Sequence, residues 1–360
     1  GAFYRISATL FFILFTGIEL IDATYYLNHY YFVSVISFLL IFVPAHRMYS
    51  LDVRLGLIKL RDSVPALSIY LIMFQLGLVY FLAGIAKINS DWLFEAMPLS
   101  IWLPAQDDFP LIGPLFQYKL TAFAFSWGGM FYDLLIPFVL LSSRLRWLGY
   151  LAVIGFHLMT WFLFQIGMFP FIMIGATLIF FSADFHHTIH SFLGGRVKLS
   201  DYSRKSTYLS KPVLIAVSLF ICVQIALPFR YLLYPGNMFW HEQGYRFGWR
   251  VMLAEKAGYA QFKVEDSEGR KILIDNSEFL TPVQEKMMST QPDFMIQYAQ
   301  YLKAHYSNLG MDAAAVKADV FVTLNGRASA PFIDPNIDLA SQTDSWSHKQ
   351  WILPQKSEQI

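Results

Sequence analysis

Residues 66–87 read ALSIYLIMFQLGLVYFLAGIAK, an unbroken apolar run that ends on a single lysine. A bilayer core about 30 Å thick needs roughly 20 apolar residues per helix, and the run reaches that length before Lys87. No Asp, Glu, Lys or Arg interrupts it. The run therefore predicts a membrane-spanning helix, and the chain is expected to fold in lipid.

Six further apolar runs continue this pattern. Of the 360 residues, 56% are hydrophobic and 15% are charged, whereas about a quarter of the residues of a soluble domain are charged. Two of the runs are short for a bilayer, so tilted or re-entrant segments are expected at 31–44 and 169–182. The six runs cover roughly 6–20, 31–44, 120–142, 147–165, 169–182 and 212–229.

We predict a mainly α multi-pass membrane helix bundle of about six to seven spans over residues 1–229. The chain opens with Gly1 and has no charged segment followed by a cleavage site. A further N-terminal helix is therefore expected upstream of the numbered chain.

Basic residues gather in three of the loops, and Lys and Arg in short loops favour the cytoplasmic side of a membrane. All three loops fall on the same side of a seven-pass path. The residues after 229 are therefore predicted on the opposite, periplasmic or lumenal face. The basic residues are Arg47, Arg54, Lys59 and Arg61 in one loop, Arg144 and Arg146 in another, and Arg196, Lys198, Arg204, Lys205 and Lys211 in the third.

Residues 230–360 are more polar, and we predict a small extracytoplasmic α+β domain there. Alternating segments at 261–264 and 271–274 lie either side of a short turn, which is typical of a hairpin. A strand is expected at 319–324, before Asn325-Gly326, and a helix is expected after Pro292. The helical spacing is carried by Met295, Tyr298 and Leu302.

Several classes of function are disfavoured. The net charge of +1 gives no overall field for nucleic acid. Cys222 is the only cysteine, which excludes an intramolecular disulfide. His186, His187 and His190 lack carboxylate or cysteine partners at ligand spacing, so no metal site is expected. The sequence also has no phosphate-binding loop, dinucleotide-binding glycine motif, nucleophile elbow or His-Glu-x-x-His zinc motif.

Ionisable residues at membrane depth are candidates for function, because a centred charge costs about 2.5 to 3.5 kcal/mol even on the mildest scale. Lys87 lies on the non-cytoplasmic side, where a basic residue is disfavoured. The alternative is an anchor whose stem lies along lipid and whose amine reaches water. Asn28 and His29 lie on the same face, where an interfacial hydrogen-bonding pair is the alternative.

Two other polar residues lie inside apolar runs. Interhelical hydrogen bonding is the expected role of Asp133 and of His157, because buried polar groups in a bundle are usually paired. The outer face is also rich in aromatic residues, among them Tyr245 and Trp249. This favours either a cavity for a flat apolar ligand or an aromatic belt at the interface.

Several segments together resemble the vitamin K-dependent gamma-glutamyl carboxylases and their bacterial relatives. The similarity covers nearly the whole chain, in order, and its most specific part is Tyr80 to Lys87 followed by Asp91-Trp92. The other matching pieces are Tyr4 to Ser7, Asp22, Asn28-His29, Tyr49 to Asp52, Phe156-His157, Ile166 to Phe169, Tyr245 with Trp249, Asp334-Pro335 and Ile337-Asp338.

The resemblance implies an enzyme, a peptidyl-glutamate 4-carboxylase, which is a carbon–carbon lyase with a vitamin K epoxidase half-reaction. Lys87 matches the lysine that deprotonates reduced vitamin K, a menaquinol or phylloquinol. O2 then converts the quinol to the epoxide through a strong base. That base removes a proton from a peptidyl glutamate, and CO2 adds to the γ carbon. Neither a metal nor ATP is implied.

Further roles follow from the same resemblance. His29 matches a histidine tied to coupling the two half-reactions, and Asn28 would orient the quinone oxygen. Tyr245 and Trp249 match positions that hold the glutamate-bearing peptide. The remaining predicted quinone- or peptide-binding residues are Tyr80, His157, Met168, Phe169 and Met252. The implied partners are a quinol in the lipid bilayer and a glutamate-containing peptide or protein.

The chain also departs from the animal enzymes. Ala86-Lys87 stands where they have two lysines, and Leu27 stands where they have a second asparagine. Their longer C-terminal region and disulfide have no counterpart. These differences fit a bacterial relative in the inner membrane. Two alternatives are a quinol epoxidase without carboxylase activity and a non-catalytic quinone- or lipid-binding membrane protein.

Overall fold

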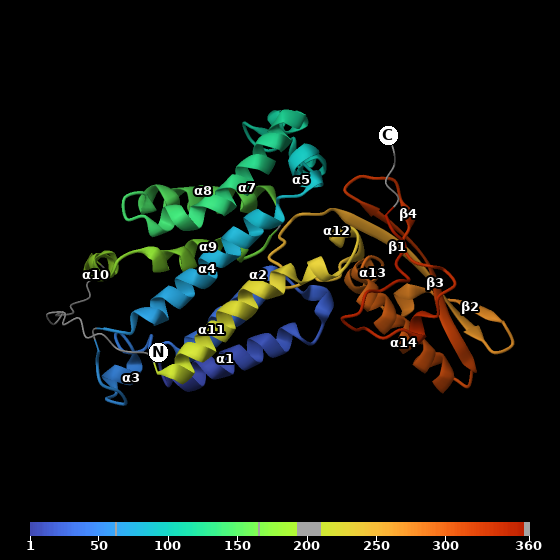
Figure 1. Ribbon diagram of the computed structural model, residues 1–360, viewed down its shortest axis with the longest axis horizontal. Coiled ribbons are helices and arrows are strands. Elements are labelled where there is room, and N and C mark those ends of the chain that lie inside the picture. The colour runs from blue at the N-terminus through green and yellow to red at the C-terminus, as the bar shows by residue number, and fades with distance from the viewer. Residues whose placement is uncertain (62, 165, 193–209, 356–360) are drawn as a thin grey trace. The chain divides into compact units, whose positions relative to one another are not determined.

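The computed structural model describes residues 1–61, 63–164, 166–192 and 210–355 (Figure 1). The chain divides into two compact units. The first comprises Gly1–Ile88 and Trp127–Ile225, and the second Asn89–Ser126 and Ala226–Ile360. A single cut between residues 229 and 230 does not reproduce this grouping, because residues 89–126 belong with the C-terminal part. Arg196, Lys198, Arg204 and Lys205, which entered the orientation argument, lie outside the described residues.

The first unit is helical, and its helices other than α3 and α10 coincide with the predicted apolar runs. α1 and α2 pack against each other, as do α8 and α9 (Figure 1). The helices are α1 (Tyr4–Glu19), α2 (Asn28–Phe42), α3 (Leu51–Arg54), α4 (Ala66–Ala86), α7 (Lys119–Leu141), α8 (Arg146–Leu163), α9 (Phe169–Thr177), α10 (Ala183–Phe192) and α11 (Lys211–Ala226), with 3-10 turns at Ala23–Tyr25 and Leu178–Phe180.

Three helices in the described part of the chain are long and apolar enough to cross a membrane, at Ala66–Ala86, Lys119–Leu141 and Lys211–Leu233. A fourth span exists if Phe169–Phe180 and Ala183–Phe192, bent by 113°, count as one. This is fewer than the six to seven spans that hydropathy predicts. The short runs account for part of the difference, because α2 is below spanning length and the 169–182 run bends.

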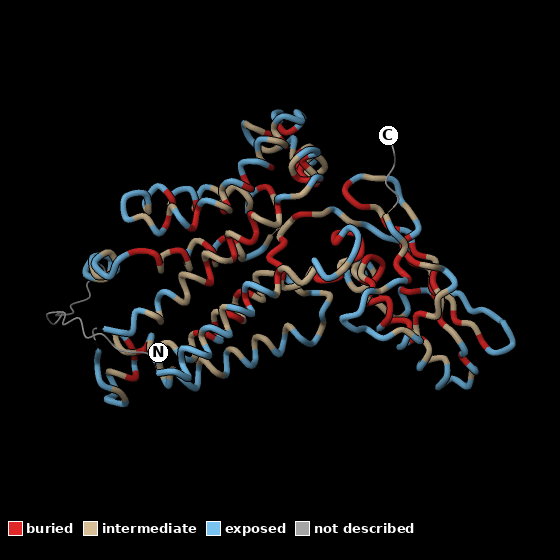
Figure 2. The backbone as a smooth tube through the Cα atoms, viewed as in Figure 1, coloured by how far each residue is buried: buried red, intermediate tan, exposed pale blue. Residues whose placement is uncertain are grey.

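The outer surface of these helices is apolar. Leu14, Leu135, Leu151 and Leu219 are each more than half exposed, at 62%, 56%, 60% and 64%. Figure 2 shows long exposed stretches along the helices, with buried residues at intervals. A surface of this kind is stable in lipid rather than in water. The predicted membrane helix bundle is therefore confirmed.

The second unit contains a four-stranded antiparallel sheet of order β2-β1-β3-β4. Its strands are β1 (Lys256–Asp266), β2 (Lys271–Leu273), β3 (Ala313–Leu324) and β4 (Ala330–Pro331). Alternate residues of β1 and β3 are buried, as expected for a sheet with one covered face. The helix α14 (Pro292–Asn308) packs on β1 and β3, with the rings of Phe262 and Tyr298 4.9 Å apart.

The predicted α+β elements are confirmed. β1 and β2 form the expected hairpin, with Val264 opposite Ile272. α14 begins at Pro292, and the residues at helical spacing, Met295, Tyr298 and Leu302, are all buried. β3 is longer than predicted. The helix α13 (Pro282–Met288) was not predicted, although Thr281 and Gln284 form a capping box at its start. The remaining short elements are α12 (Met238–His241) and 3-10 turns at Leu227–Leu233, Asn276–Glu278 and Leu339–Ser341.

Residues 89–126 are ordered by contacts with the C-terminal part of the second unit. The Asp91 carboxylate accepts hydrogen bonds from Arg327 Nη1 and Nη2 at 2.8 and 2.7 Å and from Asn325 Nδ2 at 2.6 Å. Burial alone would raise the pKa of Asp91, but the hydrogen bonds from Arg327 and Asn325 outweigh it and hold that pKa below its usual range. The segment contains α5 (Ser90–Phe94), α6 (Leu99–Trp102) and 3-10 turns at Pro104–Gln106 and Gly113–Gln117.

Candidate functional site

Lys87 caps the C-terminal end of α4, and its side chain is directed into the helix bundle. The residue is only 7% exposed. Its ammonium Nζ lies 2.6 Å from Asp133 Oδ2 of α7 and 3.4 Å from the carbonyl oxygen of Ala83. Asp133 is 4% exposed. The sequence alternative, an anchor that reaches toward water, is not the arrangement that the structure shows.

A glycine brings the two partners together. An added Cβ at Gly84 would lie 2.8 Å from the Leu134 backbone nitrogen and side chain, so α4 and α7 approach too closely for any larger residue. Gly84 is one turn before Lys87, and Leu134 directly follows Asp133. The close approach therefore sets the position of the ion pair.

The buried pair can exchange a proton. Burial disfavours a charge on either group alone, while the hydrogen bond between Nζ and Oδ2 stabilises the two charges as a pair. When the proton lies on Asp133, the Lys87 amine is neutral and can accept a proton from a ligand. When it lies on Lys87, the carboxylate stabilises the ammonium. The pair thus has the chemistry of a base with a built-in partner.

A second group of predicted residues surrounds His157 in the same unit. His157 Nε2 shares a hydrogen bond of 2.8 Å with the Tyr80 hydroxyl. The Phe169 ring lies edge-on to His157 at 5.9 Å and stacks with His29 at 5.5 Å. The structure therefore brings four predicted site residues, from α2, α4, α8 and α9, into one aromatic cluster.

This aromatic cluster, Tyr80, His157, Phe169 and His29, has one unsatisfied polar atom. His157 Nδ1 is buried without a hydrogen-bond partner among the described residues. A buried polar atom without a partner is rare in native structures and calls for an explanation. The atom can donate to or accept from a ligand, depending on the tautomer of the ring.

Tyr132 is a neighbour that the sequence argument missed. Its ring lies 6.0 Å from the Tyr80 ring and stacks on Phe156 at 4.0 Å. It precedes Asp133 in α7, so one turn of α7 contacts both the aromatic cluster and Lys87. Nothing in the sequence separated Tyr132 from the many aromatic residues of the bundle.

Two other predicted residues lie at the ends of helices. Asn28 begins α2 and accepts a hydrogen bond from the Tyr26 hydroxyl at 3.3 Å. Met168 directly precedes α9 and is 64% exposed. Their roles at the quinol site stay predictions.

In the second unit, the loop 242–252 carries the other three predicted residues, Tyr245, Trp249 and Met252. The backbone is left-handed at Phe247, Trp249 and Met252, with φ of 61°, 56° and 56°. Such values are strained for bulky residues, and strain of this kind clusters at functional sites. Trp249 is 1% exposed, so its ring is buried.

Buried polar contacts hold this loop in its strained shape. The Tyr245 hydroxyl donates to the Arg250 carbonyl at 3.1 Å. Burial and then the Glu242 carboxylate raise the pKa of Tyr245, so it stays a neutral donor. Lys256 Nζ donates to the Trp240 and Thr290 carbonyls at 2.7 and 2.8 Å and to Glu242 at 2.9 Å.

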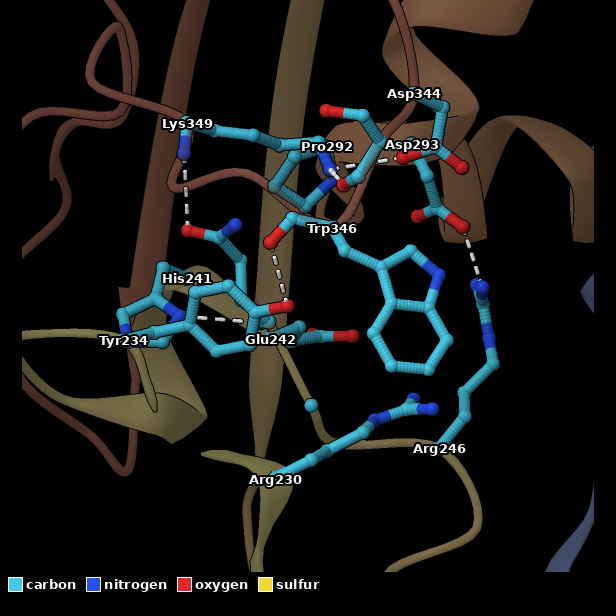
Figure 3. Close-up of a pocket in the computed structure, with 13 residues that line it drawn as sticks. Arg230, Tyr234, His241, Glu242, Arg246, Pro292, Asp293, Asp344, Trp346 and Lys349 are labelled. Carbon is cyan, nitrogen blue, oxygen red and sulfur yellow. Dashed lines mark hydrogen bonds and ion pairs between the residues drawn. The ribbon is translucent and has the colours of Figure 1, made fainter. Parts of the chain in front are cut away.

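A polar pocket of about 200 Å³ adjoins the loop, and Glu242, Gln243, Gly244 and Arg246 line part of it. Figure 3 shows the Trp346 ring above Arg230, with Arg246 beside it reaching Asp293. The Arg230 guanidinium lies 5.9 Å from the centre of the Trp346 ring, and Trp346 is 74% exposed. The pocket holds three basic side chains, Arg230, Arg246 and Lys349, and three acidic ones, Glu242, Asp293 and Asp344, so it suits a polar ligand.

No three His, Cys, Asp or Glu side chains gather to form a metal site in the described ranges. The expectation that the chemistry needs no metal stays a prediction.

Comparison with known families gives two matches. Residues 1–185 match the family model of the HTTM domain, which is a membrane domain. Residues 209–358 match the model of the vitamin K-dependent gamma-carboxylase lumenal domain. No solved structure matches the chain. The matches agree with the fold: a membrane helix bundle comes first, and a lumenal-type domain with a small sheet follows.

Proposed function

Because the chain belongs to the vitamin K-dependent gamma-carboxylase family, we propose that it oxidises reduced vitamin K with O2 to the epoxide and couples this to carboxylation of peptidyl glutamate. CO2 is added at the γ carbon of the glutamate. The observation that carries the proposal is the buried Lys87–Asp133 pair, because oxidation of the quinol begins with removal of a hydroxyl proton.

Lys87 is the proposed base. In the form with the proton on Asp133, its neutral Nζ accepts the proton of a quinol hydroxyl. The ammonium that forms donates a hydrogen bond to the neutral Asp133 carboxyl, and the quinol anion balances its charge. General bases of this kind contribute about 10²- to 10⁴-fold to rate. Asp133 is thus a positioning residue that acts through Lys87.

The aromatic cluster suits the ring of the quinol. Reduced vitamin K, when bound, supplies with O2 the strong base that removes the γ proton of glutamate. The rings of His29 and Phe169 offer flat apolar faces, and His157 Nδ1 offers a polar atom that has no protein partner in the described structure. Asn28, at the start of α2, would orient a quinol oxygen, as the resemblance implies.

The loop 242–252 and the adjoining pocket are the proposed peptide site. Tyr245 keeps its proton and gives the loop a neutral hydroxyl. Trp249 is buried within a backbone of left-handed residues, and Met252 lies at the end of the loop. Arg230 and Trp346 line a pocket suited to an acidic side chain of the substrate. The C-terminal domain matches a lumenal domain, and we propose that it lies on the periplasmic side of a bacterial inner membrane.

The test is turnover by the purified protein in detergent or nanodiscs. A glutamate pentapeptide, labelled bicarbonate, O2 and reduced vitamin K are supplied, and label in the peptide and epoxide in the lipid extract are measured together. We expect both products in equal amounts. Lys87→Ala should lose both, while Lys119→Ala, which removes an exposed lysine, should keep both.

The outcomes separate the alternatives. Epoxide without labelled peptide would identify an epoxidase that lacks carboxylation. Quinone binding without either product would point to a quinone- or lipid-binding protein. Turnover that survives Lys87→Ala would show that Lys87 is not the base.

A further inference from the structure

A loop rich in basic residues lies at the end of the helix bundle opposite Lys87. It joins the end of α2 at Phe42 to the start of α4 at Ala66, whereas Lys87 follows the last residue of α4. The 21 residues of α4 span roughly 30 Å at about 1.5 Å per residue, which is the thickness of a bilayer core. Residues 43–61, which we call the basic loop, therefore lie at the membrane surface that does not carry Lys87, on the side predicted to be cytoplasmic.

Two buried nitrogen atoms of the basic loop, His46 Nδ1 and Arg47 Nε, have no hydrogen-bond partner among the described residues. His46 is only 6% exposed. An arginine Nε can only donate a hydrogen bond, and a histidine Nδ1 donates in one of the two tautomers of the neutral ring. A buried donor without an acceptor is rare in native structures and calls for an explanation. The two neighbouring residues therefore point to an acceptor that the described part of the chain does not supply.

Protein contacts hold this pair of residues in place. The Tyr4 ring of α1 stacks on the His46 ring at 4.5 Å. Ser50 Oγ donates a hydrogen bond to the His46 carbonyl at 2.6 Å. The backbone nitrogen of Arg61 donates to the Arg47 carbonyl at 3.0 Å. The backbone that carries the two donors is thus ordered before a ligand arrives, which lowers the entropic cost of binding.

The side chains around the pair carry an excess of positive charge. Asp52 is the one acidic residue of the basic loop, and its carboxylate accepts two hydrogen bonds from backbone nitrogens at the start of α1. Burial, and then the guanidinium groups of Arg5 and Arg47, lower the pKa of His46. The missing acceptor is therefore expected to be an anion. The basic side chains, none of which forms an ion pair within the described ranges, are Arg5, Arg47, Arg54, Lys59 and Arg61.

The basic loop also exposes apolar side chains. Four leucines are each at least half exposed, and they are interspersed with the basic residues. Such a mixture is typical of a segment at a lipid surface, where the apolar side chains reach the acyl chains and the basic ones meet anionic head groups. A phosphate ion bound from solution would leave the leucines in water. The four are Leu51, Leu55, Leu57 and Leu60.

We propose that the basic loop binds the head group of an anionic phospholipid, whose phosphate oxygens accept hydrogen bonds from His46 Nδ1 and Arg47 Nε. Arginine pairs with phosphate through two parallel hydrogen bonds, so an Nη of Arg47 joins its Nε. Arg5 adds positive charge beside the His46 ring. A free phosphate ion offers the same oxygens, but only a lipid also covers the exposed leucines. The site takes no part in quinol chemistry, so it does not rest on the proposed function.

The test compares lipids that differ in the charge of the head group. The full chain is exchanged between nanodiscs of phosphatidylcholine and of phosphatidylcholine with phosphatidylglycerol, and the lipid that it retains is measured by native mass spectrometry. The wild type should retain phosphatidylglycerol in preference. Arg47→Gln and Arg5→Gln should each lower that preference about fivefold. Arg144→Gln removes an exposed arginine from another loop of the predicted cytoplasmic side, and this matched control should keep the wild-type preference.

Arg47→Lys separates a built site from a general attraction to charge. Lysine keeps the positive charge but has no Nε and cannot pair with phosphate through two parallel hydrogen bonds. A lower preference for phosphatidylglycerol in Arg47→Lys than in the wild type supports the site. An unchanged preference in Arg47→Lys, or an equal loss in Arg144→Gln and Arg47→Gln, would overturn it.

Thermal unfolding in the same nanodiscs gives a second readout. Phosphatidylglycerol should raise the unfolding midpoint of the wild type but not that of Arg47→Gln, because a ligand that binds the folded state stabilises it. An equal rise when inorganic phosphate is added to phosphatidylcholine nanodiscs would identify a free anion as the ligand and overturn the lipid site.

A protein carboxylate is the remaining source of an acceptor. Asp62 follows the basic loop in sequence and lies outside the described residues. If Asp62→Asn lowers the unfolding midpoint in phosphatidylcholine as much as Arg47→Gln does, and abolishes the preference for phosphatidylglycerol, this carboxylate rather than a lipid is the acceptor, and the proposal fails. A midpoint of Asp62→Asn equal to that of the wild type, with the preference kept, supports the lipid site.

Discussion

At the scale of single residues, the chemistry depends on which partner a buried charge meets. Lys87 could be singled out from sequence, because one lysine after a long apolar run is unusual on that side of a membrane. Its partner could not be assigned, because Asp133 lies 46 residues away and one sequence does not reveal which helices pack together. The role expected for Asp133, pairing inside the bundle, is what the structure shows.

Replacing Asp133 by Asn tests the pair. The amide keeps the shape but cannot take up the proton, so we expect epoxide formation to fall about 10²- to 10⁴-fold in kcat. Asp133→Glu, which keeps the carboxylate, should recover part of the rate. Thermal unfolding is followed alongside, since a buried ammonium without its carboxylate also lowers stability. Equal rates for Asp133→Asn and the wild type would exclude the carboxylate from the mechanism.

Trp346 allows a test of the peptide site with little risk to folding, because the ring is 74% exposed. Trp346→Ala removes the surface beside Arg230, and we expect KM for the glutamate peptide to rise several-fold while kcat at saturating peptide changes less than twofold. Tyr259→Ala removes another exposed ring of the second unit, on β1, and serves as the control. The same KM in both variants would remove the pocket from the peptide site.

At the scale of elements, the apolar runs located the helices but could not orient them. Residues of a membrane helix are apolar on all sides, so periodicity does not mark the face that meets a neighbour. The contact between Gly84 and Leu134 illustrates this. It fixes the position of the Lys87–Asp133 ion pair, and no pattern in the sequence predicts that the two residues touch. In the second unit, buried residues alternate along β1 and β3 and recur at helical spacing in α14. These patterns are visible in the sequence, which is why the prediction was confirmed.

The contact between α4 and α7 can be altered by one methyl group. Gly84→Ala places a Cβ against the Leu134 backbone, so the helices must separate. Since a displacement of about 1 Å can cost 10²-fold in rate, we expect a loss of 10- to 100-fold in quinol oxidation. The control is Gly155→Ala in α8, where an added Cβ meets nothing within 4 Å. That change should leave turnover unaltered and stabilise the helix by about 0.5 to 1 kcal/mol.

The strained loop is the element that sequence could not predict. The backbone is left-handed at Phe247, Trp249 and Met252, whereas bulky residues prefer a negative φ. The surrounding buried contacts maintain this conformation. The resemblance did draw attention to Tyr245 and Trp249. The structure alone showed that they belong to a strained loop, and that Lys256 holds its first residue, Glu242, by a hydrogen bond.

For the whole molecule, stability should depend on pH through His241 in the second unit. Burial, and then the charges of His348 and Lys256, lower the pKa of His241 to about 4. The unfolded chain takes up a proton near pH 6.5, whereas the folded chain does so only near pH 4. The contribution of neutral His241 to the free energy of unfolding is therefore complete above pH 6.5. It is lost as the pH falls toward 4, by up to roughly 3 kcal/mol.

Thermal unfolding followed by tryptophan fluorescence measures this effect between pH 7 and 4. His241→Gln, which does not titrate, should flatten the curve over that interval. Asp91 acts in a lower window: its pKa is held below the usual value, so its contribution is lost only as the pH falls below about 4. A wild-type curve that is flat from pH 7 to 4 would contradict the buried, neutral state of His241.

The grouping of residues 89–126 with the C-terminal part has a consequence for biosynthesis. Asp91 leaves the ribosome 236 residues before Arg327, which at 5 to 20 residues per second is a delay of roughly 10 to 50 s. Through that interval the Asp91 carboxylate lacks Arg327 and Asn325, and the later membrane helices are synthesised before these two residues. Nascent chains stalled within this interval should be readily cleaved by added protease, and a chaperone on the far side of the membrane would have the whole delay in which to bind them.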